Sequence, residues 1–239
     1  METLKIERQN VRMIAHRGLS GLETENTVEA FIAAANRTYY GIECDIHITK
    51  DQEFVVIHDD NTKRIGNKKL IIKDSTYLEL LNVDLYDYLF EKTHPLRKIP
   101  RLQDYLDICK KYEKVAIIEL KPRFTYEQIK RLLTILNEYN YLSSSIIISF
   151  DLENLINIRK INKDITIQYL VNEFNDEVLN NCLKYHFDID INHQNLSKEI
   201  VQILHQNNIK VNTYTVNNPI VALMLATWDV DFITTNILE

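Results

Sequence analysis

Two histidines stand where short apolar runs of this sequence end. The first run, residues 11–15, breaks directly into His16 and Arg17, and a later run, residues 54–57, breaks into His58. Because the unperturbed pKa of imidazole is about 6.5, one ring can accept a proton while a second ring donates one near neutral pH. The pattern places reactive residues at the ends of buried strands, where α/β proteins carry their chemistry; two histidines packed into a core are the alternative, which the histidines alone would favour.

Acidic residues lie between these histidines. In the run 41–48, polar and apolar residues alternate, so Glu43, Asp45 and His47 share one face of a strand. A further carboxylate, Glu119, comes directly after a later apolar run. Three carboxylates brought to one point would repel one another without a cation, which favours Mg²⁺ or Ca²⁺. Zinc is disfavoured because no His or Cys cluster has zinc-type spacing, and packing inside the fold explains His47 as well as ligation does.

The elements that must position these residues alternate regularly between strands and helices. Repeated strand–helix units imply parallel strands joined by right-handed crossovers, and eight such strands close into a (β/α)₈ TIM barrel, an α/β fold. An open doubly wound sheet is the alternative, but no Gly-rich nucleotide fingerprint is present. The expected strands are 11–15, 41–48, 115–118, 146–149, 166–171, 188–192, 210–214 and 231–234.

Two departures from an ideal barrel are expected. Residues 60–99 are polar, rich in lysine and without a clean period, and are predicted to form an insertion after the second strand. The sequence ends at Glu239, directly after the eighth strand, so the last helix is expected to be missing or very short. No linker divides the chain, and residues 1–239 are expected to form a single domain.

The composition fits a soluble globular protein. With 45% hydrophobic and 26% charged residues and a net charge of −6, nucleic acid and anionic membranes are not expected as partners. The three cysteines, in apolar contexts without paired spacing, are expected to be buried free thiols. No apolar N-terminal stretch forms a signal peptide or membrane span, which gives the expectation of a cytoplasmic protein. Nothing in the sequence indicates an oligomeric state.

An ordered set of motifs resembles the glycerophosphodiester phosphodiesterase family over nearly the whole chain. Each tripeptide alone is a weak signal, but together and in the family's order they are specific. The motifs are His16-Arg17-Gly18, Glu25-Asn26-Thr27, Glu43 with Asp45, Thr49-Lys50-Asp51, Val56-Ile57-His58-Asp59, Ile99-Pro100-Arg101-Leu102, Ile118-Glu119-Leu120-Lys121-Pro122, Ser149-Phe150-Asp151 and Val211 to Asn217.

The resemblance implies metal-dependent hydrolysis of glycerophosphodiesters to sn-glycerol 3-phosphate and an alcohol. It implies that His16 and His58 are the catalytic acid–base pair, and our initial assignment is His58 as base and His16 as acid. The implied metal ligands are Glu43, Asp45 and Glu119. Arg17 and Lys121 would bind the phosphate, although Lys121 could merely balance Glu119, and Tyr214 would form an aromatic wall where many members carry Trp.

Two other functions remain open at this stage. One is lysophospholipase D activity on a lysophospholipid, with an acyl groove expected from Leu85 to Phe90 in the insertion. The other is a barrel that binds phosphodiesters without turnover, although a binding module has no need of both histidines. Elsewhere, Asp188, Asp190 and Asn192 alternate with isoleucines, so they line the barrel interior or face a polar pocket.

Overall fold

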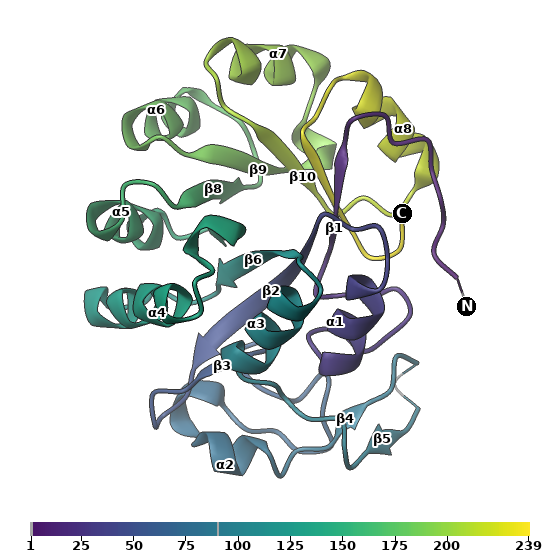
Figure 1. Ribbon diagram of the computed structural model, residues 1–239, viewed down its shortest axis with the longest axis vertical. Helices are drawn as coiled ribbons and strands as arrows, with labels where there is room; N and C mark the ends of the chain where they lie inside the picture. The colour runs from purple at the N-terminus through teal and green to yellow at the C-terminus, as the bar shows by residue number, and fades with distance from the viewer. Residues whose placement is uncertain (1, 90) are drawn as a thin grey trace.

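A closed ring of eight parallel strands forms the centre of the protein. The computed structural model describes residues 2–89 and 91–239. The strands follow one another around the ring in chain order, and pairing of the first with the second closes it (Figure 1). This confirms the predicted (β/α)₈ barrel. Its strands are β1 (Arg12–Ala15), β2 (Gly41–Ile48), β6 (Val115–Leu120), β7 (Ser145–Ser149), β8 (Thr166–Val171), β9 (Asp188–Asn192), β10 (Val211–Tyr214) and β11 (Phe232–Thr235).

Helices cover the outside of the ring between successive strands (Figure 1). Each of α1, α4, α6 and α7 starts at a Thr, Asn or Ser whose side chain accepts a hydrogen bond from a backbone N–H of the first turn. The helices are α1 (Val28–Ala35), α3 (Leu102–Lys111), α4 (Tyr126–Glu138), α5 (Leu152–Ile161), α6 (Asp176–Tyr185), α7 (Lys198–Gln206) and α8 (Pro219–Thr227). Among the described residues, none of the helices combines the length and apolar character that a membrane crossing requires.

The eighth helix is missing after β11 in the described residues, as the sequence predicted. The last residues instead run beside residues 4–6, where Leu4 and Leu238 form a parallel bridge. The Glu239 carboxylate also accepts a hydrogen bond from the Thr38 backbone N–H at 2.9 Å. These contacts fasten the two ends of the described chain to the turn after α1.

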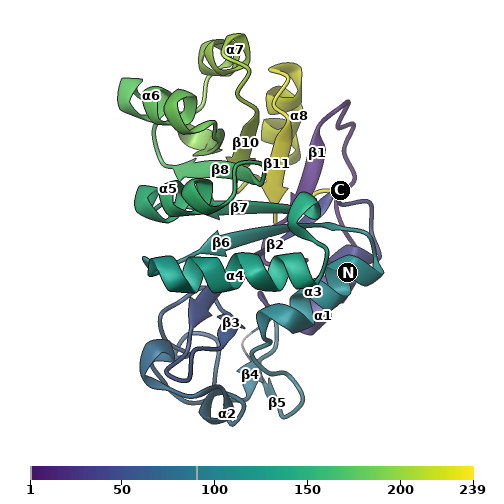
Figure 2. The ribbon, with the colours of Figure 1, turned by 60° about the vertical axis from the view of Figure 1, so that its left-hand side comes forward.

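The predicted insertion forms a separate small lobe beside the barrel (Figures 1 and 2). It begins after β3 (Phe54–Val56), which pairs antiparallel with the end of β2. Its remaining elements are a 3₁₀ turn η1 (Ile72–Asp74), α2 (Tyr77–Leu80) and the two-residue strands β4 (Leu85–Tyr86) and β5 (Thr93–His94). Apolar side chains give the lobe its own core, made of Val55, Ile57, Ile65, Ile72, Leu80, Val83, Leu85 and Ile99.

The barrel has two apolar layers. The larger lies between the strands and the helices, and the smaller fills the ring with Ile14, Ile117, Ile146, Ile148, Leu170 and Phe232. Because strand residues alternate between these layers, the face of β2 that carries Glu43 and Asp45 turns toward the ring interior. The acidic face predicted from the alternation in β2 is therefore an interior face.

A buried hydroxyl joins α3 to the two strands that carry these acidic residues. The Tyr105 side chain is fully buried, and its hydroxyl donates to the Ile42 carbonyl oxygen at 2.7 Å and lies 3.4 Å from that of Ile117. Ile42 belongs to β2 and Ile117 to β6. This contact fixes the helix against the pair of strands that builds the site.

We predict that Tyr105→Phe lowers the free energy of unfolding by about 1 kcal/mol, because a buried hydrogen bond is lost without loss of volume. Urea unfolding of the variant beside the wild type measures the change. Tyr126→Phe is the control. Because Tyr126 is exposed, removal of its hydroxyl group should change the free energy of unfolding by less than about 0.5 kcal/mol. Equal losses in both variants would contradict a special role for the Tyr105 hydroxyl.

Candidate active site

A cavity of about 200 Å³ opens at the carboxyl ends of the barrel strands. Most of the residues predicted from the sequence line it, which is where barrel enzymes place their chemistry. The predicted residues in its lining are His16, Arg17, Glu43, His58, Glu119, Lys121 and Tyr214. Asp45 lies between Glu43 and His47 on the same face of β2 and is itself fully buried.

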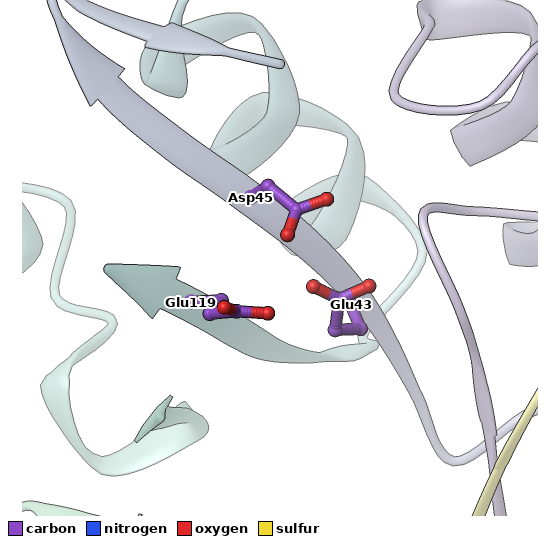
Figure 3. A group of neighbouring side chains, drawn as sticks. All are labelled: Glu43, Asp45 and Glu119. Carbon is purple, nitrogen blue, oxygen red and sulfur yellow. The ribbon is translucent and has the colours of Figure 1, made fainter. Parts of the chain in front are cut away.

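The three predicted carboxylates converge. Glu43, Asp45 and Glu119 each offer an oxygen within 4.8 Å of the other two, and Figure 3 shows them turned toward a common space between β2 and β6. All three side chains are buried. Glu43 Oε1 and Asp45 Oδ1 have no hydrogen-bond partner among the described residues. Buried oxygens left without donors are suited to a hard cation such as Mg²⁺ or Ca²⁺.

Burial and mutual repulsion perturb these carboxyl groups in different directions. Burial, together with the charges of Asp45 and Glu119, raises the pKa of Glu43 well above its usual range. Burial and the charge of Asp45 raise the pKa of Glu119 to about 7. Burial alone would also raise the pKa of Asp45, but the positive charges of Arg17 and Lys121 hold it well below its usual range. Asp45 is thus the anion of the group, and the two glutamates retain protons most readily.

Arg17 and Lys121 compensate this charge from opposite sides. Arg17 Nε lies 3.2 Å from Asp45 Oδ2, and its backbone N–H donates to Glu43 Oε2 at 2.7 Å. Lys121 Nζ lies 2.8 Å from Glu119 Oε1 and 3.5 Å from Asp45 Oδ1. Lys121 therefore does balance Glu119, and both cations still border the cavity, where a phosphate would reach them.

The His16 ring is held by an amide. Its Nδ1 lies 2.7 Å from Asn236 Oδ1, and because a carbonyl oxygen only accepts, Nδ1 carries the proton and Nε2 keeps its lone pair. Burial, followed by the charge of Arg17, lowers the pKa of His16 to about 4. His16 is consequently neutral at pH 7 and able to accept a proton.

The His58 ring is held by a carboxylate instead. Its Nδ1 donates to Asp59 Oδ1 at 2.7 Å, and Arg64 binds the same carboxylate through two nitrogens at 2.9 and 3.0 Å. Arg64 also reaches Glu25 at 2.7 and 2.8 Å, and Glu25 in turn binds Arg17 at 2.9 Å. One chain of ion pairs therefore connects His58, in the segment after β3, with Arg17, in the segment after β1.

Several residues that shape the site were missed in the sequence. Asn26 donates to Asp45 at 2.8 Å, Arg64 binds Asp59 at 2.9 Å, and Asn236 orients His16. Their partners are distant in the chain or lie in the irregular insertion, so periodicity carries no signal for them. The only sequence signal was their place in or near the recognised motifs.

Glu43 and Asp45 lie within β2, which continues outward beyond them to pair with β3. The acyl groove expected from the sequence needs correction. Leu85 is buried in the core of the insertion, so it cannot line an acyl groove, and Phe90 lies outside the described residues. For His47, both packing and ligation were open; it is not part of the carboxylate cluster, and its Nε2 lies 3.0 Å from the His58 carbonyl oxygen.

Tyr214 occupies the wall of the cavity as expected. Its ring packs edge-to-face on Phe150 with ring centres 6.2 Å apart, and its hydroxyl donates to the Val171 carbonyl oxygen at 2.9 Å. Since the hydroxyl is already bonded to the backbone, the part of Tyr214 that faces a ligand is its aromatic ring. The ring continues the apolar wall formed by Ile148 and Leu170.

Comparison with known proteins agrees with this fold and arrangement. The model of the glycerophosphoryl diester phosphodiesterase family matches residues 16–239. A glycerophosphodiester phosphodiesterase of Bacillus altitudinis is 30% identical, with 87% of this chain and 86% of that protein covered. Among solved structures, a phosphodiesterase of Oleispira antarctica in complex with the product sn-glycerol-3-phosphate superposes with a TM-score of 0.88 at 21% identity, covering 97% of this chain and 95% of that one. The glycerophosphodiester phosphodiesterase of Thermotoga maritima gives a TM-score of 0.75 at 25% identity, covering 95% and 94%.

The fold and the matched relatives define a barrel enzyme of the phosphoric diester hydrolase class. Within that class, the chain belongs to the glycerophosphoryl diester phosphodiesterase family. This confirms the family and the reaction expected from the sequence, hydrolysis of glycerophosphodiesters to glycerol 3-phosphate and an alcohol.

We predict that Asn236→Asp raises the pKa of His16 by about one unit or more, because a carboxylate 2.7 Å from Nδ1 stabilises the charged ring. An NMR titration of the ring protons from pH 7.5 down to about pH 3 follows the change, because the wild-type pKa of His16 is about 4. His47 in the same spectra is the internal control, since it does not contact Asn236. An unchanged titration of His16 would show that the ring does not face residue 236.

Proposed function

We propose that this chain cleaves glycerophosphodiesters with a divalent cation held by Glu43, Asp45 and Glu119 and with His16 and His58 as proton carriers. The observation that supports this most directly is the convergence of three buried carboxylates beside both imidazoles in one cavity. The two buried oxygens without a hydrogen bond, Glu43 Oε1 and Asp45 Oδ1, and the raised pKa of both glutamates indicate a site that is short of positive charge. A divalent cation would supply that charge and polarise a phosphoryl oxygen.

Arg17 and Lys121 are proposed to bind the non-bridging oxygens of the phosphate. Both side chains are already fixed by carboxylates, so they lose little conformational freedom when a phosphate arrives. The guanidinium group of Arg17 also offers a planar fork suited to a phosphate. The Tyr214 ring is proposed to pack against the glycerol carbons.

The hydrogen bonds of the two histidines support a reversal of our initial assignment. His16 is neutral with a free Nε2, so we assign it as the base that takes a proton from the attacking hydroxyl group. His58 donates to the Asp59 carboxylate, which stabilises a charged ring, so we assign it as the acid that protonates the oxygen of the departing alcohol. This assignment holds whether the attacking hydroxyl belongs to water or to the substrate's own glycerol; in the second case a cyclic phosphate forms and water then opens it.

A cytoplasmic location is part of the proposal. Cys44, Cys109 and Cys182 are all buried and free, which is the usual state of cysteines in a reducing compartment. The proposed partner is a small-molecule glycerophosphodiester.

The proposed function predicts release of sn-glycerol 3-phosphate from glycerophosphocholine, followed with a coupled dehydrogenase assay. EDTA should abolish the release, and excess Mg²⁺ or Ca²⁺ should restore it. His16→Ala and His58→Ala should each lower kcat by about a hundredfold or more, because each removes one proton transfer. His205→Ala is the matched control, since His205 lies on α7 and pairs with Asp231, away from the cavity.

Two outcomes would contradict the proposal in different ways. Faster turnover of lysophosphatidylcholine than of glycerophosphocholine would identify a lysophospholipase D. A His16→Ala variant with substrate binding and turnover both unchanged would leave a barrel without the proposed chemistry.

We further predict that cation affinity falls as the pH is lowered. Because the pKa of Glu119 is raised to about 7, a proton occupies it at pH 6 and must leave when the cation binds. Isothermal titration calorimetry at pH 8 and pH 6 should show about tenfold weaker binding at the lower pH. Glu119→Gln should weaken binding at pH 8 and flatten the pH dependence, whereas Glu127→Gln, on the exposed side of α4, should do neither.

The raised pKa of Glu119 also determines whether the stability of the protein rises or falls with pH. Without a cation, the folded state holds the Glu119 proton more tightly than the unfolded chain, whose ordinary value is 4.5. The contribution of Glu119 to stability is therefore present below that value and is lost as the pH rises toward 7. The contribution of Glu119 to the unfolding temperature of the cation-free protein should therefore fall between pH 4.5 and pH 7. A contribution of Glu119 that rises over this pH range would contradict the prediction.

A further inference from the structure

Asp190 is a buried carboxyl group that none of the roles above uses. It lies in the middle of β9, its exposed fraction is 2%, and its Oδ1 has no hydrogen-bond partner. Among the described residues, no hydrogen bond or ion pair to its carboxyl group is formed. Nearly all buried polar groups in proteins are partnered, so this exception calls for an explanation.

Asp190 belongs to the wall of the active-site cavity, which it shares with Glu43 and Glu119 of the acidic cluster. Around the ring, β9 is four strands from β2 in either direction, which places it across the barrel from Glu43 and Asp45. A ligand whose phosphate lies against β2 and β6 therefore extends toward β9. The group that would meet the non-phosphate end of that ligand is Asp190.

The surroundings of Asp190 are mainly apolar. Leu170 is its register partner on β8, and Ile148 lies on the next strand along the same wall. The polar neighbours Gln168 and Asn212 bond to each other at 3.0 Å and not to Asp190. The wall thus combines hydrocarbon with a few hydrogen-bonding groups, namely Asp190, Thr215 and Thr234, and such a lining suits a small polyol.

The fold itself gains nothing from this carboxyl group. Burial of a polar group without a partner is unfavourable, and burial raises the pKa of Asp190 well above its usual range. In either protonation state, a carboxyl oxygen can accept a hydrogen bond from a hydroxyl group. A residue that costs stability at a ligand cavity is typical of a functional position.

We propose that Asp190 binds a hydroxyl group of the substrate's glycerol unit and thereby determines specificity for it. The inference rests on the proposed function only for the placement of the phosphate near β2 and β6. The glycerol is favoured over the alcohol because it is small and common to all glycerophosphodiesters, and a cavity of about 200 Å³ at the barrel centre suits such a unit.

The test compares binding of two probes to the cation-loaded protein and to Asp190→Leu by calorimetry. Sn-glycerol 3-phosphate contains the glycerol hydroxyls, whereas inorganic phosphate occupies only the phosphate region. Asp190→Leu should bind sn-glycerol 3-phosphate about tenfold or more weakly, because a buried hydrogen bond is lost. Its affinity for inorganic phosphate should not change.

Stability separates this role from a structural one. Asp190→Leu should unfold at the same temperature as the wild type or higher, because an unpartnered buried carboxyl group is removed. Asp188→Asn is the matched control on the same strand, since Asp188 accepts from the Lys210 backbone N–H at 2.9 Å outside the cavity. It should retain the wild-type preference for sn-glycerol 3-phosphate over phosphate.

Equal affinity of the wild type and Asp190→Leu for sn-glycerol 3-phosphate would overturn the inference. An equal loss of affinity for both probes in Asp190→Leu would also overturn it. If the proposed function is wrong, the result is different: the wild-type protein turns over no glycerophosphodiester. The probe comparison still reports on Asp190 in that case, because it measures binding without catalysis.

Discussion

The arrangement of the site depends on the repulsion among three carboxylates buried in one small space. Glu43, Asp45 and Glu119 approach within 4.8 Å, and two protein cations, Arg17 and Lys121, lie against them. Charges taken out of water are stable only when they are paired. Because the carboxylates outnumber these cations, the deficit is met by protons, which is the physical meaning of the raised pKa values of both glutamates. A site with this deficit is able to exchange protons for a divalent cation.

The same constraint explains why the backbone at Arg17 is unusual. Its φ of 54° lies in the left-handed region, which is uncommon for residues other than glycine, and Gly18 follows with a φ of 75°. This turn lets the Arg17 backbone N–H donate to Glu43 while the guanidinium reaches Asp45. At Gly18, a Cβ would lie 2.6 Å from the Ala30 backbone carbon, so the close approach of α1 also requires glycine. Local strain here is offset by charge compensation in the cluster.

The barrel and the cluster could be predicted from the sequence because both depend on local periodicity and ordered motifs. The alternation in residues 41–48 gave the interior face of β2, and the run before Glu119 gave its neighbour. The contacts that tune the histidines could not be predicted in this way. Asn236 is 220 positions from His16 in the chain, and Arg64 lies in an insertion without regular period, so only tertiary structure brings them to the imidazoles. Tertiary contacts decide the orientation of each imidazole ring, and the proposed choice of acid and base follows from that orientation.

The ring interior is chemically divided, and this division gives the substrate a direction. The acidic cluster lies on β2 and β6, and both histidines come from segments that follow strands paired with β2, namely β1 and β3. The acidic cluster and the two histidines proposed for proton transfer therefore lie in one half of the ring, where the phosphate is proposed to bind. The rest of the cavity wall, formed by Ile148, Leu170 and Tyr214 around Asp190, offers mainly hydrocarbon. A phosphodiester with a glycerol arm fits this division in one orientation only, because reversal would place the phosphate charge against apolar side chains at a large desolvation cost.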